Sequence, residues 1–353
     1  MRLDRSTTTL LRGLLLPGAE ARSYLTEWCR ETDLQSVDSA THQLLPLLYR
    51  RLADLDLSPP EMDRLRGVHR KTWYRNQRHL AALQRANEVL SAAHIDVTLV
   101  GGLTLALGAY DDLGLRMLDA AQIVVPPETM DRCIDKLVDS GFVVEGNRRT
   151  PGFGLPTRLR HQGGGHIDVC EFVYGPGWPD ALDQRLSGRT ATIEVDEKPI
   201  RALASSDTMA ATAAFGLSAP LGTYQCFVDL VFLSNQSDRA VDWADLVADY
   251  QDTLLSVPLA EALRTIGEEI PGALNPEAGN WVPEVRPTRR QRMQFWFHRR
   301  GRRLARMPAW YWRGTRRPGS AKGTGFFAFA RSVYDVTSTR EAWAKLRRRL
   351  RRG

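Results

Sequence analysis

Two glycines and two well-separated aspartates are the residues of this 353-residue chain whose types and spacing suggest chemistry. Gly101 and Gly102 follow an apolar, β-rich stretch and open a helical pattern. The free backbone N–H groups of such a turn, with the positive end of the helix, can bind a phosphate group. Asp119 begins a second apolar stretch, and Asp168 lies in an alternating one. Carboxylates on neighbouring strands can hold Mg²⁺ beside a phosphate.

Nucleotidyl transfer needs both features, a turn that holds the triphosphate and carboxylates that neutralise its charge through a metal ion. Two carboxylates at i and i+2 lie on the same face of a strand and can share one or two metal ions. A third carboxylate from a neighbouring strand completes a two-metal site. At the i+2 position from Asp119 the chain has Ala121 instead of a second carboxylate. The pattern therefore favours the fold of such an enzyme more strongly than its activity.

The elements that must position these residues predict an α/β (α+β) fold. A small mixed sheet forms a nucleotidyltransferase-like core, and helical segments flank it on both sides. Within the core, hydrophobic patterning predicts strands at 96–100, 121–125 and 166–172 and an amphipathic helix at 128–140. We expect four regions: a helical segment at 1–95, the α/β core at 96–204, a second helical segment at 205–282, and a basic, aromatic-rich tail at 283–353 that begins with a linker.

The net charge of +7 conceals a marked asymmetry. From Arg286 to the C-terminus there are 21 Lys and Arg residues and 2 acidic ones, which gives +19. The remaining residues carry 27 basic and 39 acidic side chains, which gives −12. Such asymmetry is typical of chains with a polyanionic partner. Three interpretations of the tail stay open: it binds nucleic acid, it binds an anionic membrane surface, or it is a solvated segment that docks on the acidic body.

Cysteine usage and hydropathy bear on the compartment. The four cysteines are far apart and have no CxxC spacing, which argues against a disulfide framework or a zinc site. No apolar run approaches the roughly 18 residues of a membrane-spanning helix. We expect a cytoplasmic protein, with peripheral membrane association through the tail as one alternative.

Several segments in order resemble an uncharacterised nucleotidyltransferase family of the polymerase-β-like superfamily. They are LVGGLTLALGAY (99–110), LRMLDAAQIVV (115–125) and GHIDVCEF (165–172), with helical signatures THQLLPLLYRRL (41–52) and CFVDLVFLSNQSDRAVDWADLVADY (226–250) on either side. The similarity covers roughly residues 10 to 260. The chain departs from the family where it has Gly101-Gly102 in place of Lys-Gly, and where Ala121 replaces the second acid of Asp-x-Asp.

The resemblance implies roles for five residues. Gly101 and Gly102 would receive the triphosphate, and Arg116 would neutralise phosphate charge. Asp119 and Asp168 would be the catalytic carboxylates and would hold Mg²⁺ or Mn²⁺.

The implied reaction transfers NMP from an NTP to an unidentified acceptor. The alternative that Ala121 motivates is a catalytically degraded member of the family that acts as a binding or scaffold module. Asp111 and Asp112, in the turn before the second strand, are candidates to replace the missing carboxylate. For Asp229, in an apolar helical stretch, we expect a buried capping or pairing role.

Overall fold

The computed structural model describes residues 3–146, 155–174, 178, 182, 183, 186, 189–195, 198–218, 223–237, 240–300 and 311. The chain divides into two compact units, which are built from interleaved segments. Unit 1 comprises Met1–Gln77, Gly101–Leu118 and Leu203–Arg299, and unit 2 comprises Arg78–Val100, Asp119–Ala202 and Arg300–Gly353. The long helix α5 (Met62–Ala92) contributes residues to both units.

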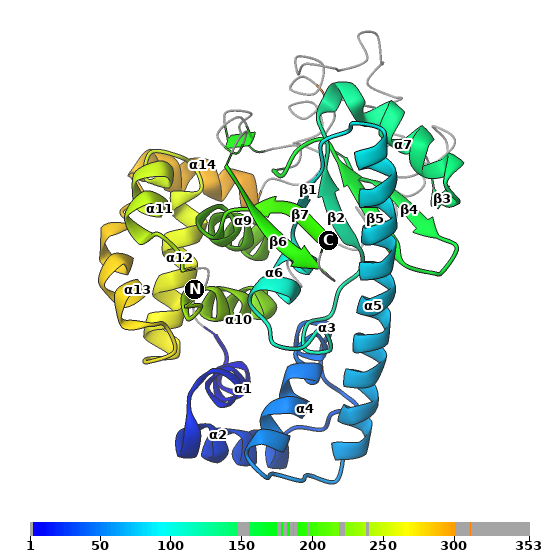
Figure 1. The fold of residues 1–353 in the computed structure, drawn as a ribbon. Helices are drawn as coiled ribbons and strands as arrows, with labels where there is room; N and C mark the ends of the chain where they lie inside the picture. The colour runs from blue at the N-terminus through cyan, green and yellow to red at the C-terminus, as the bar shows by residue number, and fades with distance from the viewer. Residues whose placement is uncertain are drawn as a thin grey trace, which may run out of the picture. The chain divides into compact units, whose positions relative to one another are not determined.

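Unit 2 is built on a seven-stranded mixed sheet with the order β3-β4-β5-β2-β1-β7-β6 (Figure 1). The strands are β1 (Thr98–Val100), β2 (Ala121–Val124), β3 (Phe142–Val144), β4 (Thr157–His161), β5 (His166–Cys170), β6 (Thr190–Val195) and β7 (Lys198–Leu203). Strand β2 pairs antiparallel with β1 and parallel with β5, and β4 pairs antiparallel with β5. The central strands are buried, and their side chains Leu99, Ile123 and Ile167 are fully shielded from solvent.

A short 3-10 turn, η1 (Pro127–Thr129), leads from the sheet into helix α7 (Met130–Asp139), which packs on β3 and β5. Its apolar side chains recur at helical spacing, and Cys133, Ile134 and Leu137 are buried. Gly141 follows the helix with φ +99°, a conformation that favours glycine, and returns the chain to β3.

The N-terminal part of unit 1 is helical: α1 (Arg5–Leu15), α2 (Gly18–Glu31), α3 (Ser39–His42), α4 (Leu45–Asp54), the first half of α5, and α6 (Gly102–Gly108). Asp4 caps α1 by accepting a hydrogen bond from the Thr7 backbone N–H at 2.9 Å. Helices α1 and α2 pack against each other through leucine side chains such as Leu11 and Leu25, both fully buried.

The C-terminal part of unit 1 contains α9 (Ser205–Ser218), α10 (Thr223–Ser234), α11 (Trp243–Tyr250), α12 (Ser256–Glu269), α13 (Pro276–Trp281), the 3-10 turn η2 (Val282–Glu284) and α14 (Arg289–Arg300). Asp242 caps α11 by accepting from the Asp245 backbone N–H at 2.9 Å. Helices α9 and α10 are apolar on most sides and pack together.

Helix α14 begins inside the segment for which the sequence predicted only a linker. Thr288 and Gln291 form a reciprocal capping box: the Thr288 N–H donates to the Gln291 amide oxygen, and the Gln291 N–H donates to the Thr288 hydroxyl. The Gln291 amide also donates to the carbonyls of Gln251 and Thr253, which docks the helix. The predicted tail beyond residue 300, apart from residue 311, lies outside the described residues.

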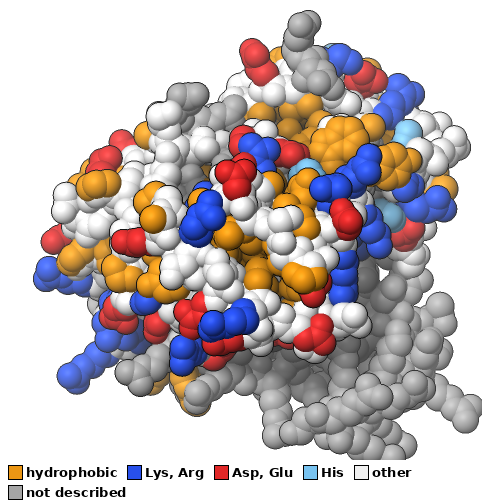
Figure 2. All heavy atoms as spheres, turned by 90° about the horizontal axis from the view of Figure 1, so that it is seen from below, with side chains coloured by type: hydrophobic (Ala, Val, Ile, Leu, Met, Phe, Trp, Pro, Cys, Tyr) orange, Lys and Arg blue, Asp and Glu red, His pale blue; other side chains and the backbone are white. Residues whose placement is uncertain are grey.

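The expected α/β class, a mixed sheet with helical segments before and after it in the chain, is confirmed. The predicted strands near 98, 121 and 166 and the helix near 130 are present, with ends that differ by one or a few residues. Among the described helices, none combines the length and apolar character needed to cross a bilayer. Figure 2 shows Lys and Arg side chains gathered beside hydrophobic ones toward the right of the view, on a surface that elsewhere mixes both signs of charge.

Close packing between α9 and α10 yields a prediction about stability. A Cβ added at Gly216 of α9 would overlap the side chain of Cys226 on α10, whereas one added at Gly67, in the exposed interior of α5, meets no atom within 4 Å. We expect Gly216→Ala to lower the free energy of unfolding by ~1–3 kcal/mol through overpacking. Gly67→Ala should raise it by ~0.5–1 kcal/mol because alanine is the better helix former. Urea unfolding of both variants checks this, and a Gly216→Ala protein as stable as wild type would contradict the packing.

Candidate functional site

The glycine turn begins helix α6 and is closely packed. Gly101 has φ +70° and ψ −147°, a backbone conformation that only glycine adopts readily. A Cβ at Gly102 would overlap the guanidinium of Arg116 and the side chain of Leu118. The structure thus brings together three residues predicted to bind a nucleotide, Gly101, Gly102 and Arg116. Nucleotide binding by these residues stays a prediction.

Arg116 is held by Asp229, a buried carboxylate of helix α10. Its Nε and Nη2 atoms donate to the two oxygens of Asp229, each at 2.9 Å. Burial alone would lower the pKa of Arg116, but the charge and hydrogen bonds of Asp229 outweigh burial and raise it. The bidentate pair leaves Nη1, the atom nearest Gly102, outside the ion pair.

Two further groups complete the environment of Asp229. The Tyr110 hydroxyl donates to Asp229 Oδ1 at 2.6 Å, and the Gln225 amide donates to the same oxygen at 3.2 Å. Burial and the negative charge of Asp229 raise the pKa of Tyr110 well above its usual value. The expected pairing role of Asp229 is confirmed, and its cation is Arg116.

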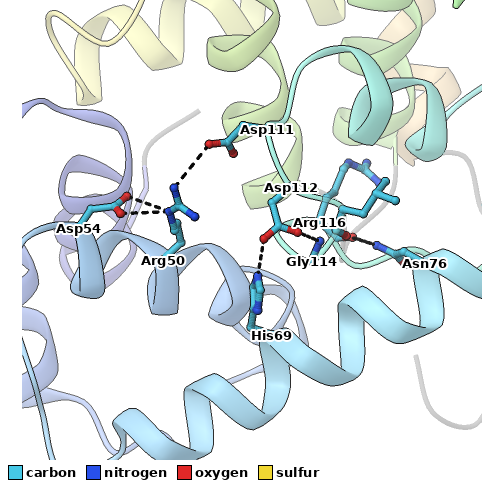
Figure 3. A network of polar contacts seen from close by, with 9 residues as sticks. Arg50, Asp54, His69, Asn76, Asp111, Asp112, Gly114 and Arg116 are labelled. Carbon is cyan, nitrogen blue, oxygen red and sulfur yellow. Dashed lines mark hydrogen bonds and ion pairs between the residues drawn. The ribbon is translucent and has the colours of Figure 1, made fainter. Parts of the chain in front are cut away.

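The loop that carries Asp111 and Asp112 is fixed by helices α4 and α5 (Figure 3). Asp112 accepts from the Gly114 backbone N–H at 2.6 Å, and its other oxygen lies 3.0 Å from His69 Nε2. Asp111 lies 3.9 Å from the guanidinium of Arg50. Both aspartates, considered from the sequence as replacements for a missing metal ligand, therefore have partners within unit 1.

Asn76 of α5 anchors the same loop through two of its backbone carbonyls. Its side-chain amide donates to the carbonyls of Leu113 at 2.6 Å and Arg116 at 2.7 Å, and Asn76 itself is fully buried (Figure 3). One amide group thus fixes the two ends of the segment that delivers Arg116 to Asp229.

Asp168, the predicted third carboxylate, is neutralised by an arginine on the neighbouring strand of unit 2. Arg158 and Asp168 are direct partners in the antiparallel β4–β5 ladder. Arg158 Nε and Nη2 donate to the two oxygens of Asp168, both at 2.7 Å, and Asp168 is only 5% exposed. The hydrogen bonds to Asp168 raise the pKa of Arg158 despite its partial burial, and the charges of Asp168, Asp119 and Glu145 add to the effect.

The pairing between β2 and β5 decides which residues share a sheet face with Asp168. Gln122 is the parallel partner of Asp168, and Ala121 is the partner of Ile167. Because paired residues point to the same face and neighbours alternate, Gln122 lies on the face of Asp168. The residue of β2 that shares the face of Asp168 is therefore an amide and not a carboxylate, and Ala120 precedes the strand.

Asp119 lies outside the strand, in a bend before β2, and is exposed. It belongs to the same unit as Asp168 and acts electrostatically on Arg158. Two carboxylates, Asp119 and Asp168, thus act on the guanidinium of Arg158. The sequence pattern did not indicate a role for Arg158.

A family model described as "Uncharacterised nucleotidyltransferase" matches residues 39–268. The chain belongs to this uncharacterised nucleotidyltransferase family. Among solved structures it is similar to an antigenic nucleotidyltransferase-like protein from Paracoccidioides brasiliensis, with 14% identity and a TM-score of 0.36 over 61% of this chain and 94% of that one. No curated protein matches the chain.

Membership of the nucleotidyltransferase family raises the question of whether these residues fit Mg²⁺. Mg²⁺ prefers carboxylate and other oxygen ligands in near-octahedral geometry. Both oxygens of Asp168 accept from Arg158, and its partner on β2 is Gln122. No group of three His, Cys, Asp or Glu side chains in the described part of the chain is arranged to hold a metal ion. The donor set does not fit a two-metal site, and the assignment of Asp119 and Asp168 as metal ligands stays a prediction.

The Arg158–Asp168 pair leads to a prediction about stability in this nucleotidyltransferase-family protein. Arg158→Ala leaves a buried carboxylate without its cation, so we expect the free energy of unfolding to fall by ~1–3 kcal/mol, with the exposure of Arg158 limiting the loss. Arg160→Ala, two residues along the same strand, removes a pair with the partly exposed Glu145 and should cost less than ~1 kcal/mol. Urea unfolding of both variants measures the difference. Equal losses would show that Asp168 does not depend on Arg158.

The role of Asn76 as the anchor of the Arg116 loop can be tested by thermal unfolding. Asn76→Ala leaves two carbonyls of the loop without their donor, and we expect a loss of ~2–4 kcal/mol, at ~1–2 kcal/mol for each of the two part-buried hydrogen bonds. Asn87→Ala is the matched control, because Asn87 lies on the same helix and is only half-buried. Thermal unfolding followed by circular dichroism should show a large fall in Tm for the first variant and little change for the second. An unchanged Tm for Asn76→Ala would contradict the anchoring role.

Proposed function

We propose that this protein uses the nucleotidyltransferase fold as a binding module and does not carry out metal-dependent nucleotidyl transfer. One observation carries the proposal: the buried carboxylate Asp168 is paired with Arg158, and its partner on β2 is the neutral Gln122. The reaction needs a cluster of negative charge that attracts divalent ions. Here a single carboxylate is neutralised by the chain itself, and the adjacent positions are neutral.

A second candidate function is NMP transfer from an NTP to a hydroxyl or phosphate acceptor. It is supported by the family to which the chain belongs and by the turn at Gly101 and Gly102. The position of Arg116 beside Gly102 also supports it, because Nη1 is outside the pair with Asp229. In this candidate, Asp119 and Asp168 would hold Mg²⁺ and Arg116 would neutralise phosphate charge. Arg158 would have to release Asp168 first.

Radiolabel transfer distinguishes the two candidates. The wild-type protein is incubated with each α-labelled NTP in Mg²⁺ and in Mn²⁺, with protein, RNA and small-molecule acceptors. The binding-module proposal predicts no transfer above a no-protein control. Transfer at an ordinary enzymatic rate, about 1 s⁻¹ or faster, that Asp168→Asn abolishes would overturn it.

The sheet register gives a sharper set of variants. Gln122→Asp places a second carboxylate on the face of Asp168, whereas Ala121→Asp places one on the opposite face, at a fully buried position. We expect only Gln122→Asp to gain metal-dependent NTP binding, measured by calorimetry with and without Mg²⁺. Ala121→Asp should instead lower the Tm, because it buries an unpaired charge. A gain of binding in Ala121→Asp alone would contradict the register argument.

A further inference from the structure

Helix α5 carries a run of positive charge within unit 1. Residues 64–77 contain five basic side chains and no acidic one, which gives +5. The chain before Arg286 carries −12 overall, so this segment opposes the charge of the body around it. The five are Arg64, Arg66, Arg70, Lys71 and Arg75.

The helix presents most of this charge on one face. Leu65, Thr72 and Asn76 are buried and lie on one side of α5, at about 3.6 residues per turn. The exposed residues occupy roughly the opposite half of the circumference; they are Arg64, Arg66, Arg70, Lys71, Trp73 and Tyr74. We call these six the α5 basic face. Its orientation within unit 1 is fixed by the hydrogen bonds of Asn76 to the loop at Leu113 and Arg116.

Three cations of the α5 basic face are not neutralised by the described residues. Arg66 forms an ion pair with Asp63 at 3.0 Å. Arg64, Arg70 and Lys71 form no ion pair with any described carboxylate. Charges of this kind attract a polyanion, because binding releases the counterions that a phosphate backbone condenses.

Two large aromatic rings accompany the charges. Trp73 is 44% exposed and Tyr74 is 62% exposed, on adjacent positions after Arg70 and Lys71. Exposed rings beside phosphate-binding cations provide stacking surfaces for unpaired bases. A membrane-binding helix would instead need a continuous apolar face opposite its charged face. On α5 the face opposite the cations carries Leu65, Thr72 and Asn76 and is buried in the protein, which favours a nucleic acid over a lipid surface.

We propose that the α5 basic face binds single-stranded nucleic acid, with Arg64, Arg70 and Lys71 contacting phosphates and Trp73 stacking on a base. From Arg64 to Tyr74 the helix rises about 15 Å, enough for a few nucleotides. The inference goes beyond the proposed function and holds whether or not the fold transfers nucleotides. It assigns a class of partner to a surface of unit 1, whereas Asp168 and Arg158 belong to unit 2.

The test is fluorescence anisotropy of a labelled 20-nucleotide oligo(U) with the full-length protein. Arg70→Ala combined with Lys71→Ala should weaken binding at least tenfold. It should also reduce the slope of log Kd against log salt by about 1.4, because about 0.7 of a counterion is released per single-strand contact. Trp73→Ala should weaken binding by at least fivefold, and Trp73→Phe should restore most of it.

The matched control is Arg264→Ala combined with Lys136→Ala, which removes two exposed cations from α12 and α7. It keeps the same net charge change and leaves both α5 and the basic tail intact. The proposal is overturned if the α5 double variant binds no more weakly than this control variant. It is also overturned if the α5 variant loses binding to phosphatidylglycerol vesicles while its affinity for oligo(U) is unchanged. Circular dichroism confirms that both variants are folded, as their exposed positions lead us to expect.

Discussion

Two buried carboxylates, one in each unit, are each compensated by an arginine, and these two ion pairs fix the elements that carry the candidate site residues. Asp168 in the sheet and Asp229 in helix α10 are each almost fully buried, and each accepts two hydrogen bonds from a single arginine. An uncompensated charge would cost about 1–3 kcal/mol at Asp168, where the arginine is partly exposed, and more at Asp229, where both partners are largely buried. Each pair therefore fixes the elements around it: Arg158 joins β4 to β5, and Arg116 joins its loop to α10.

The same two ion pairs bear on whether the fold can bind metal ions for nucleotidyl transfer. In a metal-dependent transferase, clustered carboxylates stay negative until a divalent ion and a triphosphate arrive. Here the arginines are part of the folded chain, so the neutralising charge is present before any ligand binds. This arrangement is compatible with a stable binding protein that keeps the fold of its family. The positive charge available to partners lies elsewhere, on exposed surfaces such as that of α5.

Much of the fold could be predicted from the sequence, because hydrophobic alternation and glycine positions mark the strands and helix ends. The pairing role of Asp229 could also be predicted, since an acid in an apolar helix needs a partner. The sheet face on which the motif near Asp119 lies could not be predicted. Strand β2 begins only at Ala121, and its pairing with β5 decides which of its residues share a face with Asp168. The partner of Asp168 could have been predicted from the sequence. A hairpin centred on Gly163 places Arg158 opposite Asp168, and Gly163-Gly164-Gly165 marks that turn.

The central claim is that Arg158, and not a metal ion, neutralises Asp168. An anomalous difference map tests it most directly, from crystals of the wild-type protein grown with Mn²⁺ and a non-hydrolysable NTP analogue. The account predicts no manganese peak within coordination distance of Asp168, and a guanidinium of Arg158 still bound to both carboxylate oxygens. A manganese ion on Asp168, with Arg158 displaced, would contradict it.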